Sequence, residues 1–303
     1  MTAFRWLAEF LLPGLPIARP LTLGGIHVLP VPRGENERSH SNGHLTFEPD
    51  THLRDAEARA HAQSQLELVA LAATATGGSV GEPVVTSVRL DNQADLEASG
   101  VPIPLDACFT LKWKVLAPDI DETAVIKGYR VALEFGPQEA PFWRRAARWL
   151  WKANSEAHPY DRFLALWIAF NVLYGPKRID SEPNAIRNYL AETIPSEQVA
   201  RSLLAGVIEE DLRLLGGSGL SLRRDKSWPV ADELQVALGT PETTPSPRQV
   251  LTLSCLVVYA VRCAVVHEGG FDIPREKEVG LVWASGRVLK AVLMHAFKSR
   301  LGV

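Results

Sequence analysis

The chain has 303 residues, of which 46% are hydrophobic and 22% are charged, and its formal net charge is −3. This composition is that of an ordinary globular protein and excludes wholesale disorder, and the length suits two domains. Charged residues interrupt every apolar run before the ~20 residues that a membrane helix needs, and the N-terminus lacks the pattern of a secretory signal. We therefore expect a cytoplasmic protein without membrane contact.

The cysteine content argues against a disulfide framework. Cys108, Cys255 and Cys263 are odd in number, and no CxxC pair marks a zinc site. The sequence also lacks a carboxylate cluster of the kind that binds two metal ions. We expect neither a metal site nor a cofactor.

Charge is distributed unequally between the two halves of the chain. Residues 1–137 contain 11 Lys and Arg against 17 Asp and Glu, a net charge of −6, whereas residues 138–303 contain 21 against 18, a net charge of +3. Nucleic-acid-binding proteins are often strongly basic, so any contact with RNA must come from a local patch in the second half. For the acidic first half, we expect a regulatory protein or a small ligand as the partner.

The first half is predicted to consist of strands separated by turns. Four segments are rich in β-branched and aromatic residues and partly alternate between apolar and polar positions: residues 21–29, 84–90, 109–116 and 126–135. Residues 55–75 are ambiguous, since an alanine-rich beginning favours a helix while residues 66–71 favour a strand. We expect a β-rich domain over residues 1–137 that senses a trigger or positions a substrate.

Helical spacing dominates residues 138–303. Helices are predicted at residues 143–152, 160–174, 184–193, 196–215, 250–267 and 275–300, with loops at 216–229 and 240–247. Ser246 and Pro247 form a good start for the fifth helix, and Gly269 and Gly270 form its end. The predicted fold class is α+β with two domains, in which an all-α bundle of four or five helices follows the β-rich domain.

Arg262 and His267 lie in the last turns of an otherwise apolar predicted helix. Burying a guanidinium among Val, Leu and Tyr is costly unless it is paired or faces a cavity or an interface, so Arg262 is a functional candidate. Along an ideal helix Arg262 and His267 would point ~140° apart. They converge only if the helix bends or frays near His267, or if each works with residues of a partner subunit. In the structural alternative, Arg262 pairs with an acid such as Asp161 and His267 caps the helix.

Two segments together resemble a HEPN domain of the ApeA-like group. They are YAVRCAVVHEGG, residues 259–270, and DRFLALWIAFNVLYG, residues 161–175. The family signature is an arginine followed, after four to six residues, by a histidine near the end of the third long helix. The resemblance covers about residues 155–300. It implies a homodimer whose two such helices face each other across a cleft, and a metal-independent endoribonuclease activity of the toxin or antiviral-defence type.

The resemblance also implies roles for the two residues. His267 would accept the proton of a ribose 2′-hydroxyl or protonate the leaving 5′-oxygen, and Arg262 would hold the phosphate and stabilise charge on its oxygens. Active members commonly carry Asn or another polar residue after the arginine, where this chain has Cys263. A catalytically silent HEPN-like module that binds RNA or a nucleotide is therefore the alternative function, and a purely structural dimerisation module is a third.

Several other residues are candidates for supporting roles. Asn171, a lone amide in an apolar helix, is expected to bond a neighbouring helix or to support the site, and Glu268 is expected to be solvated or to assist His267. Basic residues interleaved with tryptophans form a second group: Arg144, Arg145, Arg148 and Lys152. Such a helix can follow an RNA backbone and stack bases, or it can pack its tryptophans on the bundle and leave the charges in solvent.

Overall fold

The computed structural model describes residues 5–15, 17, 19–30, 40–49, 53–77, 80–90, 120–177, 181–222, 228–239, 246–268 and 275–303. Cys108 and the strand expected over residues 109–116 lie outside these ranges. Contacts divide the chain into two units, the first made of Met1–Arg144 with Phe297–Val303 and the second of Arg145–Ala296. The last residues of the chain thus group with the first unit, whereas the expected division placed them with the helical half.

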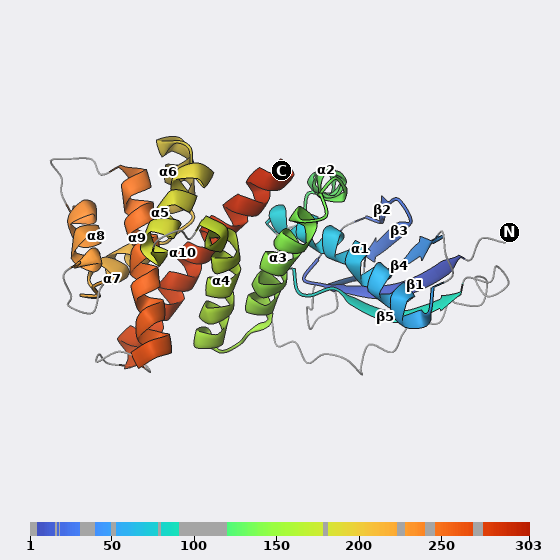
Figure 1. The fold of residues 1–303 in the computed structure, drawn as a ribbon, viewed down its shortest axis with the longest axis horizontal. Coiled ribbons are helices and arrows are strands. Elements are labelled where there is room, and N and C mark those ends of the chain that lie inside the picture. The colour runs from blue at the N-terminus through green and yellow to red at the C-terminus, as the bar shows by residue number, and fades with distance from the viewer. Residues whose placement is uncertain are drawn as a thin grey trace. The chain divides into compact units, whose positions relative to one another are not determined.

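The first unit contains a five-stranded antiparallel sheet with the strand order β2-β3-β4-β1-β5 (Figure 1). Its strands are β1 (Trp6–Pro13), β2 (Leu21–Leu23), β3 (Ile26–Pro30), β4 (His40–Phe47) and β5 (Val84–Leu90). The strand predicted at residues 84–90 is confirmed. The segment predicted as one strand at 21–29 is a hairpin of two strands, because Gly24 turns the chain with a φ of +61° that other residues rarely adopt.

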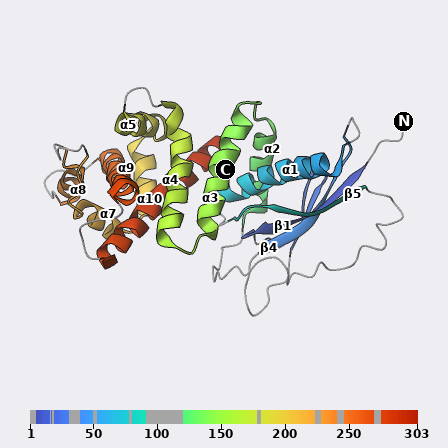
Figure 2. The same ribbon diagram turned by 60° about the horizontal axis from the view of Figure 1, so that its bottom comes forward.

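The ambiguous segment is a helix over its whole length. α1 (Asp55–Ala75) lies across one face of the sheet (Figures 1 and 2). Every residue from Leu66 to Ala75 is buried, so this half of the helix has no polar face and its sequence carries little helical periodicity. Burial on all sides therefore explains why residues 66–71 also fit a strand.

The strand predicted at residues 126–135 is wrong, because residues 126–133 belong to the helix α2 (Glu122–Leu133) and the last two follow its end. Asp121 caps that helix by accepting hydrogen bonds from the N–H groups of Thr123 and Ala124. The buried positions are Val125, Gly128, Tyr129 and Ala132, which is helical spacing. Packing of this stripe outweighs the strand preference of its β-branched and aromatic residues.

The second unit is helical, as predicted, and the α+β order of the chain is confirmed. Its helices are α4 (Pro159–Tyr174), α5 (Glu182–Thr193), α6 (Glu197–Ala205), α7 (Glu209–Gly216), α8 (Val230–Gly239) and α9 (Pro247–Cys263), while α3 (Glu139–Ser155) and α10 (Arg275–Leu301) contribute residues to both units. The described residues therefore form more helices than the four or five expected, and α8 was not expected at all.

The single helix predicted at residues 196–215 is two helices. α6 ends at Gly206, whose N–H bonds the carbonyls of Leu203 and Leu204, and α7 begins after Ile208, which has an extended backbone. Glycine is a poor residue for a helix interior, so the chain turns here rather than continuing. The break gives the second unit two short helices that both contact α9.

α9 forms the core of the second unit, where it contacts α5, α6, α7 and α8 (Figure 1). Ser246 caps its beginning by accepting a hydrogen bond from the Gln249 N–H, and Pro247 occupies the first turn, as predicted. Among the described residues, Pro247–His267 is the one stretch long and apolar enough to cross a membrane, and 61% of its apolar 18-residue window is buried inside the protein. A core helix of a globular protein meets the same criterion.

Candidate active site at the end of α9

Arg262 and His267 are in direct contact. α9 is a regular α-helix up to Cys263, and a π-helical turn, Ala264–Glu268, follows it. Within this arrangement the Arg262 Nη1 atom lies 2.9 Å from the His267 Nε2 atom. The Arg262 side chain is half-buried and His267 is exposed, so both can meet a ligand from solvent.

The π turn is the physical reason for this contact. In an α-helix the hydrogen bonds join residues four apart. A side chain five positions further along therefore points more than a third of a turn away from the direction of the first side chain. In a π-helix they join residues five apart, and a side chain five positions along returns to the same side. The bend that brings the two side chains together is therefore a widened turn, and it lies at Ala264–Glu268, directly after Arg262 and Cys263.

The contact fixes the hydrogen-bonding state of the histidine ring. A guanidinium has five N–H donors and no acceptor, so Nε2 of His267 must accept the hydrogen bond from Arg262. The ring in this arrangement is neutral and carries its proton on Nδ1. Its donor, the Nδ1–H, is then available to a partner outside this pair.

Arg262 does not pair with the acid proposed in the structural alternative. Asp161 lies 3.6 Å from His158, and both side chains are more than half exposed. Within the described part of the chain, Arg262 has no carboxylate at ion-pair distance, and its one hydrogen bond goes to His267. Its remaining N–H groups are therefore open to an anionic ligand.

Asn171 belongs to a half-buried polar network with Tyr174 and Glu182. Its Nδ2 donates to the Tyr174 hydroxyl at 2.9 Å and to Glu182 Oε1 at 3.3 Å, and the Tyr174 hydroxyl donates to the same carboxylate oxygen. The expected hydrogen bond from Asn171 to a neighbouring helix is thus present, because Glu182 begins α5. The network joins the end of α4 to the beginning of α5.

The charge of Arg262 acts on the tyrosine of this network. Burial raises the pKa of the Tyr174 hydroxyl above its ordinary value, and the hydrogen bond to Glu182 and its negative charge raise it further, while Asn171 and Arg262 act in the opposite direction. Tyr259 on α9 has a raised pKa as well, chiefly through burial, with Glu182 raising and Arg262 lowering it. The charges of Arg262 and Glu182 therefore act on the same two tyrosines.

Cys263 contacts the aromatic side of the site. It is half-buried and unpaired, and a hydrogen bond between its thiol and the Tyr259 hydroxyl contributes to the raised pKa of that tyrosine. The Trp167 ring lies 5.8 Å from both the Tyr174 and the Tyr259 rings, centroid to centroid. These three rings form an aromatic wall beside the polar network.

Glu182 is the site residue that sequence reasoning missed. It stands between the helix cap Ser181 and Pro183, where an acidic residue is ordinary because it favours the positive end of the helix. Only its position beside Tyr174 and Asn171 indicates another role. Glu268 completes the π turn, and its side chain lies outside what the structure describes.

The basic residues of α3 are arranged much as expected for a helix that packs its tryptophans on the bundle and leaves its charges in solvent. Arg145, Arg148 and Lys152 are exposed, whereas Arg144 is partly buried; Trp151 is buried, and Lys152 lies over the Trp149 ring at 5.2 Å. The tryptophans therefore pack while three cations remain in solvent. An exposed row of cations remains compatible with a nucleic-acid backbone.

The described residues contain no group of three or more His, Cys, Asp or Glu placed to hold a metal ion.

No protein-family model matches the chain, and no curated protein or solved structure matches it. The resemblance to HEPN domains therefore depends on the residues of the two motifs.

Proposed function

We propose that the protein is a metal-independent endoribonuclease of the toxin or antiviral-defence type, with Arg262 and His267 as its catalytic pair. The observation that carries this proposal is the 2.9 Å contact between the Arg262 Nη1 and His267 Nε2 atoms at the exposed end of α9. It unites, on one side of a helix, a cation suited to phosphate and an imidazole suited to proton transfer. The HEPN-like character of the helical unit is part of the same proposal.

The two residues would act in sequence on RNA. When a phosphodiester binds, its oxygens draw the N–H groups of Arg262, which releases Nε2 of His267. The freed nitrogen then accepts the proton of the ribose 2′-hydroxyl as that oxygen attacks phosphorus. The bond from phosphorus to the 5′-oxygen breaks, and the leaving 5′-oxygen takes up a proton from the imidazolium just formed or from water. The guanidinium stabilises the additional charge on the phosphate oxygens, which is where a fixed cation contributes most to the rate.

The same proposal includes a homodimer through the helical unit and RNA as its partner. Val266, in the π turn that follows α9, is 46% exposed. A single exposed apolar residue is ordinary on a protein surface, so the homodimer is proposed from the resemblance to HEPN domains and not from this residue. Arg145, Arg148 and Lys152 would contact the RNA backbone outside the cleft.

The second candidate function is a catalytically silent RNA- or nucleotide-binding module. One observation favours it: the position after Arg262 holds a thiol that bonds Tyr259 rather than an amide directed at the substrate. In this case Arg262 would bind phosphate and no bond would break.

Cleavage of RNA tests the first proposal. The purified protein, incubated with single-stranded RNA in EDTA, should leave 2′,3′-cyclic phosphate ends and should not cut DNA of the same sequence. His267→Ala should lower the rate by ~10²–10⁴-fold, and Arg262→Ala should be similarly severe. Circular dichroism must show that both variants fold. Cleavage that survives in both variants, or that needs magnesium, contradicts the proposal, whereas tight RNA binding without cleavage supports the silent module.

A further inference from the structure

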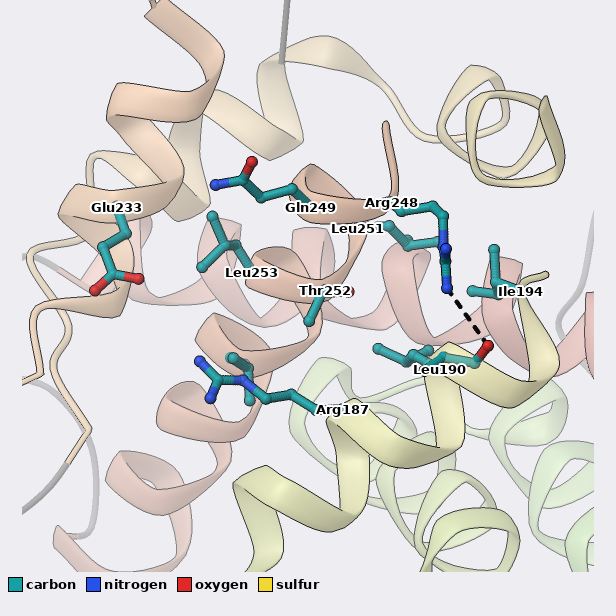
Figure 3. Close-up of a pocket in the computed structure, with 11 residues that line it drawn as sticks. Arg187, Leu190, Ile194, Glu233, Arg248, Gln249, Leu251, Thr252 and Leu253 are labelled. Carbon is teal, nitrogen blue, oxygen red and sulfur yellow. Dashed lines mark hydrogen bonds between the residues drawn. The ribbon is translucent and has the colours of Figure 1, made fainter. Parts of the chain in front are cut away.

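A pocket of about 310 Å³ lies between α5, α8 and the first turns of α9 (Figure 3). It is distinct from the Arg262 site. Arg248 lines the pocket and stands 14 residues before Arg262 on the same helix, a separation of ~21 Å along the helix axis. The volume is at the lower end of the range for small-molecule sites.

Aliphatic residues supply just over half of the pocket wall, and polar residues, Gln249 and Thr252 among them, supply the rest. The apolar lining residues come from α5, from the residue that follows it and from α9: Leu190, Ala191, Ile194, Leu251, Leu253 and Leu256. A surface of this kind is favourable for the hydrocarbon or ring part of a ligand, because transfer of that part from water is favourable. The wall by itself would not select a charge.

Two arginines supply the charge. Arg187 comes from α5 and Arg248 from the first turn of α9, and Figure 3 shows both side chains at the pocket. Within the described residues neither guanidinium forms an ion pair. Arg248 uses one N–H for the Ala191 carbonyl at 3.4 Å, and Arg187 lies over the Trp228 ring at 4.4 Å. Among the described residues, no other partner takes up their remaining N–H donors.

These contacts also hold the two guanidiniums in place. A stacked arginine and an arginine bonded to a backbone carbonyl lose less freedom on binding than free side chains would. A fixed guanidinium fork fits a carboxylate or a phosphate through two parallel hydrogen bonds. The pocket thus has prepared donors for an oxyanion.

The nearby carboxylates are already in use. Glu233, the one acidic residue of the lining, accepts a hydrogen bond from the Trp228 Nε1–H at 3.0 Å. Glu197 accepts hydrogen bonds from the Ser246 hydroxyl at 2.7 Å and from the backbone N–H of Arg248 at 3.0 Å. These bonds hold the pKa of Glu197 below its ordinary value. The lining itself has two cations against one anion, and the neighbouring Glu197 adds a second negative charge beside Arg248, so selection of an anion depends on direct contact with the guanidiniums and not on net charge.

We infer that this pocket binds a small anion that carries one carboxylate or phosphate group on a compact apolar body. The oxyanion contacts Arg248 or Arg187, and the apolar body lies on the aliphatic wall. This inference does not depend on the RNase proposal, since it concerns the opposite end of α9.

Calorimetric titration of the full chain tests the inference. The probes are phenyl phosphate and benzoate, which combine an anion with a ring, and inorganic phosphate and benzyl alcohol, which supply one part each. Phenyl phosphate or benzoate should bind at least tenfold more tightly than inorganic phosphate and benzyl alcohol do. Comparing the two aromatic anions distinguishes a phosphate ligand from a carboxylate ligand.

Variants show whether binding occurs in this pocket. Arg187→Gln removes an exposed side chain and should fold, and Arg248→Gln is the second variant. The variant that lacks the arginine in contact with the oxyanion should bind the favoured probe at least tenfold more weakly. Arg213→Gln is the matched control, because Arg213 is an exposed arginine on α7 paired with Glu209 and outside the lining. Four outcomes overturn the inference: no binding of either aromatic anion, unchanged binding by both Arg187→Gln and Arg248→Gln, inorganic phosphate binding as tightly as phenyl phosphate, or benzyl alcohol binding as tightly as the aromatic anions.

Discussion

The Arg262 guanidinium reaches Nε2 of His267 at 2.9 Å although the two residues are five positions apart on one helix. The π turn Ala264–Glu268 makes this possible, since regular α-helical geometry would direct the side chains ~140° apart. Wide turns of this kind are rare and occur frequently at functional sites. The proposed site therefore depends on a local departure from regular structure.

The residue after Arg262 should influence the rate of RNA cleavage. Cys263→Asn places an amide where the thiol now bonds Tyr259, and an amide has two donors and one acceptor for the phosphate or the 2′-hydroxyl. We expect cleavage by this variant to equal or exceed that of the natural protein. Cys263→Ala is the matched control, because it removes the thiol without adding an amide. Initial rates on one RNA under identical conditions give the comparison, and a lower rate for Asn than for Ala would contradict the prediction.

The charge of Glu182 should oppose binding of RNA at Arg262. Glu182→Gln keeps an oxygen for the Tyr174 hydroxyl and removes a negative charge that acts on the same tyrosines as Arg262. In a His267→Ala background, which removes cleavage, we expect a lower Kd for RNA and a steeper dependence of Kd on salt.

Fluorescence anisotropy with a labelled RNA measures the effect of Glu182→Gln. Glu210→Gln, an exposed acidic residue of α7, removes the same charge elsewhere and should change Kd less. Equal effects of the two substitutions would mean that Glu182 acts only through net charge. Weaker binding by Glu182→Gln would mean that the carboxylate positions the site rather than opposing the phosphate.

The helical unit could be predicted well where local signals are strong. Pro159 and Gly175 bracket α4, and Ser246 with Pro247 begins α9, so the predicted bounds of both helices agree closely with the structure. The contact between Arg262 and His267 required a bend that the sequence permits but does not specify. Glu182 gave no signal, because its proximity to Tyr174 arises from the packing of α5 against α4.

The sheet was harder to predict because its central strand has few strand-forming residues. β4 reads HSNGHLTF, and its place between β1 and β3 rather than its composition makes it a strand. A Cβ atom on Gly43 would lie 2.0 Å from the His27 carbonyl oxygen and 2.7 Å from the Phe10 ring. The glycine that weakens the strand signal is therefore needed for the strands to approach each other.

Alkaline pH should destabilise the protein through Cys255. Burial raises the pKa of this thiol to about 12, whereas in the unfolded chain it ionises near 9. Between these values the folded state binds more protons than the unfolded state, so the free energy of unfolding must fall as pH rises from about 9 towards 12. The stabilisation that comes from the un-ionised Cys255 thiol is present in full below pH 9.

Urea unfolding at several pH values from 7 to 10 measures this effect. Cys255→Ala should be less stable at pH 7, because it leaves a small cavity, but its free energy of unfolding should change less between pH 8.5 and 9.5. Above about pH 10 the buried tyrosines Tyr174 and Tyr189 add the same trend, since burial raises their pKa values as well. Parallel pH curves for the two proteins would contradict the prediction.

If the protein is a dimer, each subunit should supply its own catalytic pair. Arg262 and His267 contact each other within one chain, so an Arg262→Ala subunit and a His267→Ala subunit each lack a complete pair. Mixed dimers of the two variants, formed by co-expression with different affinity tags, should cleave RNA no faster than either variant alone. Sedimentation must first show dimers at micromolar concentration, and a monomer would contradict the proposed assembly. Recovery of roughly a quarter or more of the natural rate would mean that an arginine of one subunit works with the histidine of the other, and the contact seen within the chain would then not be the catalytic one.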